Sequence, residues 1–155
     1  MRQFYTVTQK LHDLLIADQN INVVTIGDVS EVDLAKQTIF PLAHIMVGDT
    51  TLNGNTMTMN FTVICMDIVD IDKRDLRDED EPFYGTNDLQ DIWNTQLAVC
   101  NRLVESLRRG TAFTDGYQLT GGVNATPFKD RFENLLAGWA IDLAIDVPNT
   151  EICVG

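Results

Sequence analysis

The densest group of ionisable side chains lies in residues 67–86, where eight acidic and three basic residues leave a local net charge of −5. Carboxylate oxygens are the ligands that hard cations such as Mg²⁺ and Ca²⁺ prefer. Asp70 and Asp72, together with the run 78–81, are therefore candidates for a metal site, although the D-x-D-x-D-G frame of an EF-hand is absent. The stretch has too few apolar residues to build a core, which favours a long exposed acidic loop or arm.

The enzymatic hypothesis is a metal-dependent hydrolase that uses the 67–81 carboxylates. Asp67, Asp70 and Lys73 could form the acid–acid–lysine metal site of a nuclease, but a nuclease also needs a basic groove to hold its substrate. The chain has 11 Lys and Arg residues against 23 Asp and Glu residues, a formal net charge of −12. Because a surface this acidic repels phosphate, we predict no tight nucleic-acid groove and favour a protein that is not an enzyme.

The cysteine and histidine residues form no recognisable catalytic or metal-binding pattern. Cys65, Cys100 and Cys153 are far apart and include no C-x-x-C pair, which predicts free thiols rather than zinc ligands or a redox pair. His12 and His44 are each isolated, and neither has a serine or cysteine nucleophile motif nearby. We therefore predict no catalytic residue, no metal and no cofactor.

Length and composition indicate one globular domain. The chain has 155 residues, of which 45% are hydrophobic, and this is typical of a single folded unit. We expect one domain over residues 1–148 and a flexible tail over residues 149–155. No apolar run approaches the roughly 20 residues of a membrane helix, and residues 1–4 do not resemble the start of a secretory signal. We therefore expect no membrane contact.

Two segments have the periodicity of amphipathic helices. Apolar residues recur at helical spacing over residues 3–17, and the polar stretch 18–20 ends this helix. The second helix covers residues 88–109, with carboxylates in its first turn and Arg108-Arg109-Gly110 at its end, where cations and a glycine cap are favoured. Its inner face is predicted to consist of Ile92, Gln96, Val99, Cys100, Leu103 and Leu107.

Five segments have the composition of strands, namely residues 21–26, 42–47, 56–66, 117–120 and 134–147. Asn53-Gly54 predicts a type I′ hairpin turn before the third of them. The third and last strands alternate apolar with polar residues, so each has one polar face that is exposed or contacts a polar partner. The pattern predicts an α+β fold: a mostly antiparallel sheet of about four to five strands packed against two helices, with a long acidic loop or arm.

The polar strand faces and the acidic arm are the candidate contact surfaces. On the strands, the candidate subunit or partner contacts are Asn60, Thr62 and Asp142. In the arm they are Asp70, Asp72, Lys73, Arg74, Arg77, Asp78, Asp80, Phe83 and Tyr84. The two aromatic residues could dock the end of the arm, and its charges would set the register of a contact more than its affinity.

Four stretches carry a resemblance to a known family. They are VDLAKQTIFPLAH at 32–44, MDIVD at 66–70, NTQLAVCNRL at 94–103 and RFENLLAGW at 131–139. Together with the overall layout, which covers nearly the whole chain, they resemble the small tail-terminator or tail-completion proteins of tailed bacteriophages. The resemblance implies an α+β subunit of a hexameric ring that caps the tail tube and joins it to the head-side connector.

The resemblance also implies partners and a location. The partners would be further copies of the chain, the tail tube protein and a head-side connector or stopper protein, while DNA passes through the ring without specific binding. The location would be the neck of the virion, with the host cytoplasm during assembly. Another neck protein, such as a stopper or adaptor, is the alternative within this class. A closed ring needs two different surfaces on each subunit, because its contacts are heterologous.

Overall fold

The computed structural model describes residues 3–27, 39–69, 87–109, 118–131 and 135–148. These residues form two helices and six strands. In chain order they are α1 (Gln3–Ile16), β1 (Val23–Ile26), β2 (Leu42–Leu52), β3 (Thr56–Ile68), α2 (Asn87–Arg109), β4 (Gln118–Leu119), β5 (Ala125–Arg131) and β6 (Leu135–Pro148). The predicted α+β fold is confirmed.

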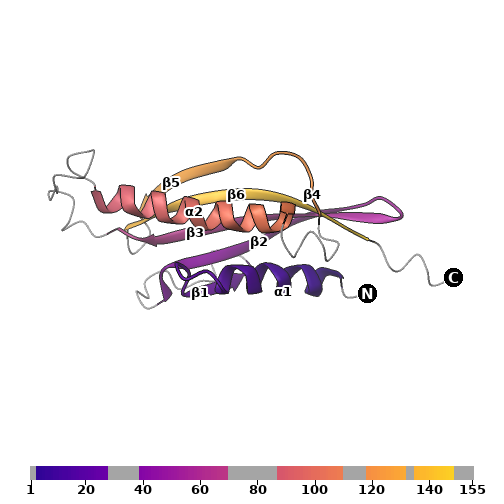
Figure 1. Cartoon of the computed structure of the whole chain (residues 1–155), viewed down its shortest axis with the longest axis horizontal. Coiled ribbons are helices and arrows are strands. Elements are labelled where there is room, and N and C mark those ends of the chain that lie inside the picture. Colours follow the sequence, from indigo (N-terminus) through magenta and orange to yellow (C-terminus); the bar gives the residue numbers. More distant parts are fainter. Residues whose placement is uncertain (1–2, 28–38, 70–86, 110–117, 132–134, 149–155) are drawn as a thin grey trace.

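One sheet contains all six described strands, in the order β1-β2-β3-β6, and both β4 and β5 pair with β6 (Figure 1). Strands β1 and β2 are parallel, and every other pair is antiparallel. The longest pairing joins β3 to β6, with Thr56 opposite Pro148 at one end and Ile68 opposite Leu136 at the other. These two central strands therefore hold the sheet together.

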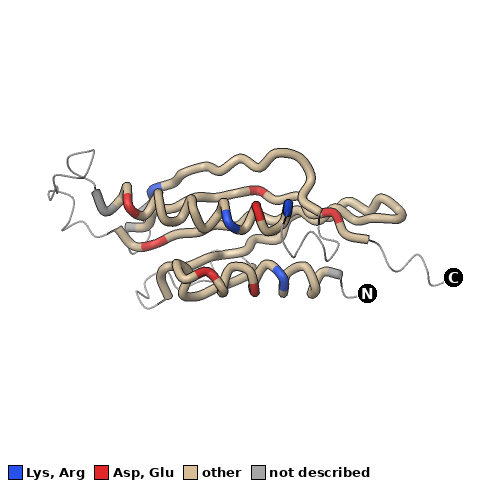
Figure 2. The backbone as a smooth tube through the Cα atoms, in the orientation of Figure 1, with Lys and Arg blue, Asp and Glu red and all other residues tan. Residues whose placement is uncertain are grey.

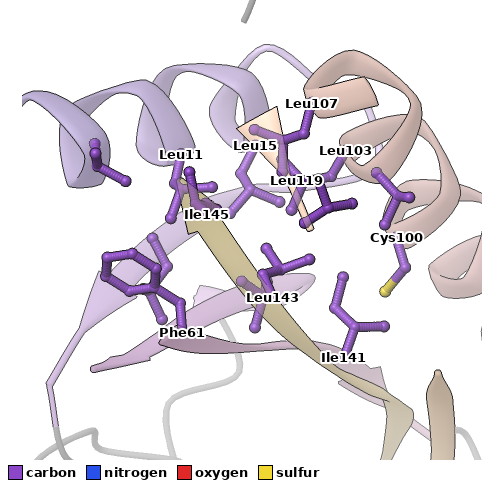
Figure 3. Close-up of a cluster of buried hydrophobic side chains, with 14 of the residues drawn as sticks. Leu11, Leu15, Phe61, Cys100, Leu103, Leu107, Leu119, Ile141, Leu143 and Ile145 are labelled. Atoms are coloured by element: carbon purple, nitrogen blue, oxygen red, sulfur yellow. The ribbon is translucent and has the colours of Figure 1, made fainter. Parts of the chain in front are cut away.

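Both helices pack on the same face of the sheet. Val7, Leu11 and Leu15 recur on one side of α1, and all three are buried. Figure 3 shows side chains of α1, α2, β3 and β6 converging on one another, among them Leu11, Leu103, Phe61 and Leu143. Full burial of one large apolar side chain contributes about 1.5–3 kcal/mol, so this shared core fixes the helices on the sheet.

The predicted inner face of α2 and the predicted apolar face of β3 agree with the structure, because both faces are buried in the core. All six predicted inner-face residues of α2 are buried, and Gln96 is among them with 1% of its surface exposed. The alternating residues of β3 from Met57 to Cys65 are buried against the helices, as predicted. Cys65 and Cys100 are buried free thiols, whereas Cys153 lies outside the described residues.

Four details of the prediction are corrected. Strand β2 continues to Leu52, five residues past the predicted end, and β3 continues to Ile68, so Asp67 and Ile68 belong to a strand and not to the loop. The turn at Asn53-Gly54 is not type I′, because three residues connect the strands and only Gly54 has a positive φ, of 79°. Strand β5 was not predicted. The rest of the arm (70–86) and the tail (149–155) lie outside the described residues.

Gly138 allows β6 to approach β3 closely. Gly138 pairs with Met66, and a Cβ atom at this position would overlap the carbonyl oxygen of Cys65 and lie 2.8 Å from Met66 Cα. Any larger residue would therefore force the two central strands apart. A glycine at this point is a requirement of the strand pairing.

Trp93 and Trp139 tie α2 to the strands beneath it. The indole Nε1 of Trp139 donates to the carbonyl oxygen of Trp93 at 2.8 Å, and that of Trp93 donates to the carbonyl oxygen of Phe128 at 3.2 Å. Both rings are half-buried. The indole N–H groups are thus both used within the fold.

Candidate functional site

The face of the sheet away from the helices has two unlike halves. At one end Phe40, Leu42, Met66 and Leu136 form a second buried apolar cluster. At the other end no described element covers the strands, and the side chains are Thr58, Asn60 and Thr62 from β3 with Asp142 and Asp146 from β6. We call these five residues the open-face patch.

The pairing of β3 with β6 places the patch residues opposite one another. Thr62 lies opposite Asp142, and Thr58 lies opposite Asp146. The hydroxyl of Thr62 donates to Asp142 Oδ1 at 2.6 Å, and the hydroxyl of Thr58 donates to Asp146 Oδ1. Directly opposed strand residues of this kind stabilise the pairing of the two strands, so both carboxylates are held in fixed positions.

A hollow of about 260 Å³ opens in this patch above Ala144. Asn60, which lies opposite Ala144, and the pair Thr62 and Asp142 form its polar wall. Glycines at positions 48 and 122 line it without side chains. The small side chain of Ala144 leaves space between the polar side chains of Asn60, Thr62 and Asp142.

The structure brings three predicted contact residues together in this hollow, namely Asn60, Thr62 and Asp142. The other nine predicted contacts, in the acidic arm, lie outside the described residues. Sequence reasoning missed Thr120, Ala144 and the two glycines. An alanine on the polar face of a strand is a weak signal for a hollow, and only the strand register shows what surrounds it.

A second cleft, of about 480 Å³, lies between the end of α1 and the middle of α2. Arg102 crosses it to Asp18, with Nε donating to Oδ2 at 2.7 Å and Nη2 donating to Oδ1 at 2.9 Å. Burial raises the pKa of the Asp18 carboxyl, but the hydrogen bonds from Arg102 and the Asn20 amide and the charge of Arg102 outweigh it and leave the pKa lowered. The ion pair lies in the cleft and links the segment that follows α1 to α2.

Two further ionisable side chains of the described residues are buried within the fold. His44 is fully buried and hydrogen-bonded through Nδ1 to Thr25 Oγ1 at 2.7 Å and through Nε2 to the Gly27 carbonyl oxygen at 2.9 Å. The hydrogen bond with Cys100, and then burial, raise the pKa of the Cys65 thiol, which disfavours a reactive thiolate. The described residues contain no cluster of three His, Cys, Asp or Glu placed to bind a metal.

Both edges of the sheet are poor templates for pairing with another strand. Strand β5 carries Pro127, which has no N–H, and the exposed Lys129. The outer edge of β2 beyond Ile45 has no strand partner among the described residues, and its register shifts between Val47 and Thr50. Proline, lysine and irregular register are common features of edges that do not extend a sheet. We therefore expect contacts with other chains to form through surface side chains and not through backbone pairing at these edges.

Three apolar residues on the β1–β2 side of the sheet are exposed. Ile26, Val47 and Leu52 are 49%, 48% and 71% exposed. Ile26 ends β1 opposite Ile45, and Val47 and Leu52 follow along β2. We call these three residues the apolar edge. Contiguous exposed apolar patches are typical of interaction surfaces, whereas single exposed apolar residues are common; α1 carries three further exposed apolar residues, Phe4, Tyr5 and Ile16.

Figure 2 marks acidic positions in red on both helices, on β3 and on β6, and basic positions in blue on both helices and on β5. Within the described ranges, neither helix combines the length and apolarity needed to span a bilayer. The amino-acid sequence matches no protein-family model and no curated protein.

Proposed function

We propose that this chain is a structural subunit of a ring at the head–tail junction of a tailed bacteriophage, where six copies cap the tail tube and join it to the head-side connector. The resemblance carried by the stretches 32–44, 66–70, 94–103 and 131–139 supplies the class. The α+β fold, with two helices on one face of a sheet, is compatible with the subunits of that class.

The observation that carries the proposal is that one subunit has two unlike uncovered surfaces. The open-face patch is polar and acidic, through Asp142 and Asp146, whereas the apolar edge is formed by Ile26, Val47 and Leu52. A closed ring joins unlike surfaces of neighbouring copies, because its contacts are heterologous. A subunit with two different uncovered surfaces can contact a neighbour on each side.

The acidity of the chain supports passage of DNA without retention. The formal net charge is −12, and phosphate contacts from lysine and arginine provide most nonspecific affinity for DNA. A lumen lined by acidic residues would repel the phosphate backbone during packaging and ejection. In this role the ring acts by shape and contact and carries out no reaction.

The partners follow from the position of the ring. One rim would contact the tail tube protein and the other a head-side connector or stopper protein, and assembly would take place in the host cytoplasm before the chain enters the neck of the virion. A stopper or adaptor ring in the same neck is the alternative within this class. It would use the same two lateral surfaces but contact different partners above and below.

The test measures the oligomeric state of the full chain and of two matched variants by light scattering after size exclusion. We expect Leu52→Glu to shift the ring toward monomer, because a charge replaces a side chain that becomes buried between subunits. Leu97→Glu, on α2 and 40% exposed, is the control and should leave the ring intact. A wild-type chain that never forms a ring would contradict the proposal, and an effect of both variants would contradict the role of the apolar edge.

A further inference from the structure

We infer that the hollow above Ala144 is a docking site for an arginine side chain presented by a basic segment of another protein. The inference rests on the proposed function for its setting, because it gives the chemistry of one contact of the open-face patch. Its evidence is the hollow itself, which is lined by Asn60, Thr62, Thr120 and Asp142.

The hydrogen bonds within the hollow occupy most of the side-chain donors of its lining residues and leave mainly acceptors available. Thr62 donates its hydroxyl to Asp142 Oδ1 at 2.6 Å, and Thr120 donates its hydroxyl to the Ala144 carbonyl oxygen at 3.1 Å. Asn60 donates an N–H to the Asp49 carbonyl oxygen at 2.8 Å. The two hydroxyl oxygens, the side-chain carbonyl oxygen of Asn60 and the second oxygen of Asp142 remain as acceptors, and the second N–H of Asn60 remains as a donor. Because acceptors predominate among these groups, the hollow favours a ligand that brings hydrogen-bond donors.

The charge of the hollow selects a cation. Asp142 is exposed, and it forms no ion pair with a lysine or arginine of the described residues. Lys129 pairs with Ala137, which places it by alternation on the face that the helices cover. Arg108, whose guanidinium lies beside the Thr120–Gly122 segment, donates to the Gly121 carbonyl oxygen at 3.5 Å and forms no ion pair with Asp142. Within the described residues, the Asp142 carboxylate thus has no ion-pair partner and is complementary to a positive, donor-rich group.

Among cationic groups, the guanidinium fits best. It carries five N–H donors in a plane and no acceptor, so it can bond to a carboxylate and to neighbouring oxygens at the same time. A volume of about 260 Å³ is well above the roughly 30 Å³ share of one water, which leaves room for this planar group. A divalent metal ion is disfavoured, because Mg²⁺ and Ca²⁺ sites of proteins usually combine several oxygen ligands around more than one carboxylate.

The occupant comes from a protein because the surrounding surface is a sheet face with a fixed pattern. The Thr62–Asp142 and Thr58–Asp146 pairs lie before and after the Asn60–Ala144 pair along the two strands, so a segment lying along the strands meets polar groups on either side of the hollow. The acidic surface excludes nucleic acid by repulsion of its phosphates. A basic segment of a neighbouring protein has the required charge and shape.

The test titrates the ¹⁵N-labelled full chain with a five-residue peptide that has a central arginine, followed by NMR. The control peptide has citrulline in place of arginine, which keeps the shape and removes the charge. We expect saturable shifts of the amide signals of Thr62, Asp142 and Ala144, with a Kd near or below 1 mM for the arginine peptide and at least about tenfold weaker binding of the citrulline peptide.

Two variants separate the hollow from general electrostatic attraction. Asp142→Asn removes the charge, and Ala144→Leu fills the hollow while it keeps the charge; each should weaken binding about tenfold. Asp91→Asn, an exposed position on α2, should leave the Kd unchanged. The inference is overturned if citrulline binds equally well, if Ala144→Leu has no effect, or if the shifts lie elsewhere.

The outcomes also distinguish the inference from the proposed function. If the peptide binds in the hollow but the chain forms no ring, the proposed function fails and the arginine site stands. If the ring forms and the peptide does not bind, the ring stands and this inference fails. If wild-type rings form and Asp142→Asn prevents them, the arginine comes from a second copy of this chain.

Discussion

Arg102→Met is expected to lower the free energy of unfolding by about 1–2 kcal/mol at neutral pH. The Asp18 side chain is only 7% exposed, and the positive charge of Arg102 balances that of the carboxylate through two hydrogen bonds, at 2.7 and 2.9 Å. Methionine keeps most of the apolar stem of arginine in the cleft but removes both donors. Asp18 then retains the backbone N–H of Asn20, at 3.0 Å, as its remaining hydrogen-bond donor among the described residues.

The matched control is Arg109→Met. Arg109 also forms an ion pair, at 3.0 Å with Glu105, but the two side chains are 78% and 39% exposed. An exposed pair four residues apart on a helix contributes about 0.3–0.5 kcal/mol. Urea unfolding followed by circular dichroism measures both variants, with an unchanged m-value as the check on two-state behaviour. The reasoning is refuted if Arg102→Met destabilises the chain no more than Arg109→Met does.

The pH dependence of the same variant gives the sign of the effect. The folded-state pKa of Asp18 is lowered, so its contribution to stability is present above the unfolded value of about 3.9. That contribution is lost as the pH falls through the lowered folded-state pKa. The stability difference between wild type and Arg102→Met should therefore shrink below about pH 3.9. A difference that stays constant into acid would contradict the assignment of the ion pair.

Two further predictions concern glycines and a third concerns cations. Gly138→Ala should lower the free energy of unfolding by about 2 kcal/mol or more, because the added Cβ would overlap the carbonyl oxygen of Cys65. Gly122→Ala is the neutral control, because a Cβ at that position would have no atom within 4 Å. Urea unfolding measures both variants. Gly54→Ala should cost about 1 kcal/mol in the same assay, because φ is 79°. Excess Mg²⁺ should leave the melting temperature unchanged, whereas a clear rise would favour the metal-dependent hydrolase.

The elements that the sequence predicts well are those with a strong local signal. The helix over residues 88–109 is observed as Asn87–Arg109, because its apolar period, its basic last turn and its terminal glycine agree. Strand β5 was missed, because Pro127 and Lys129 are unfavourable in strands and only the pairing with β6 makes the segment extended. The parallel pairing of β1 with β2 likewise depends on contacts between separated parts of the chain.

The candidate site was predictable in its residue types but not in its geometry. Alternation along each strand places Asn60, Thr62 and Asp142 on polar faces, and the structure places all three around one hollow. Local pattern does not encode which residue of β6 lies opposite Thr62, because the register joins positions 80 residues apart. The hollow also depends on Ala144 and on glycines at position 48, within β2, and at position 122, after β4, which have no chemical signature in a sequence.

The mass of the assembled wild-type chain tests the proposed ring of six copies directly. Native mass spectrometry should detect a closed species of about 104 kDa, six times the subunit mass of 17.4 kDa, with no ladder of larger forms, because a closed ring leaves no surface for further growth. At about 1 mM even a contact with a Kd in that range is half occupied. A chain that stays monomeric up to this concentration would contradict the proposed ring, and so would open-ended filaments.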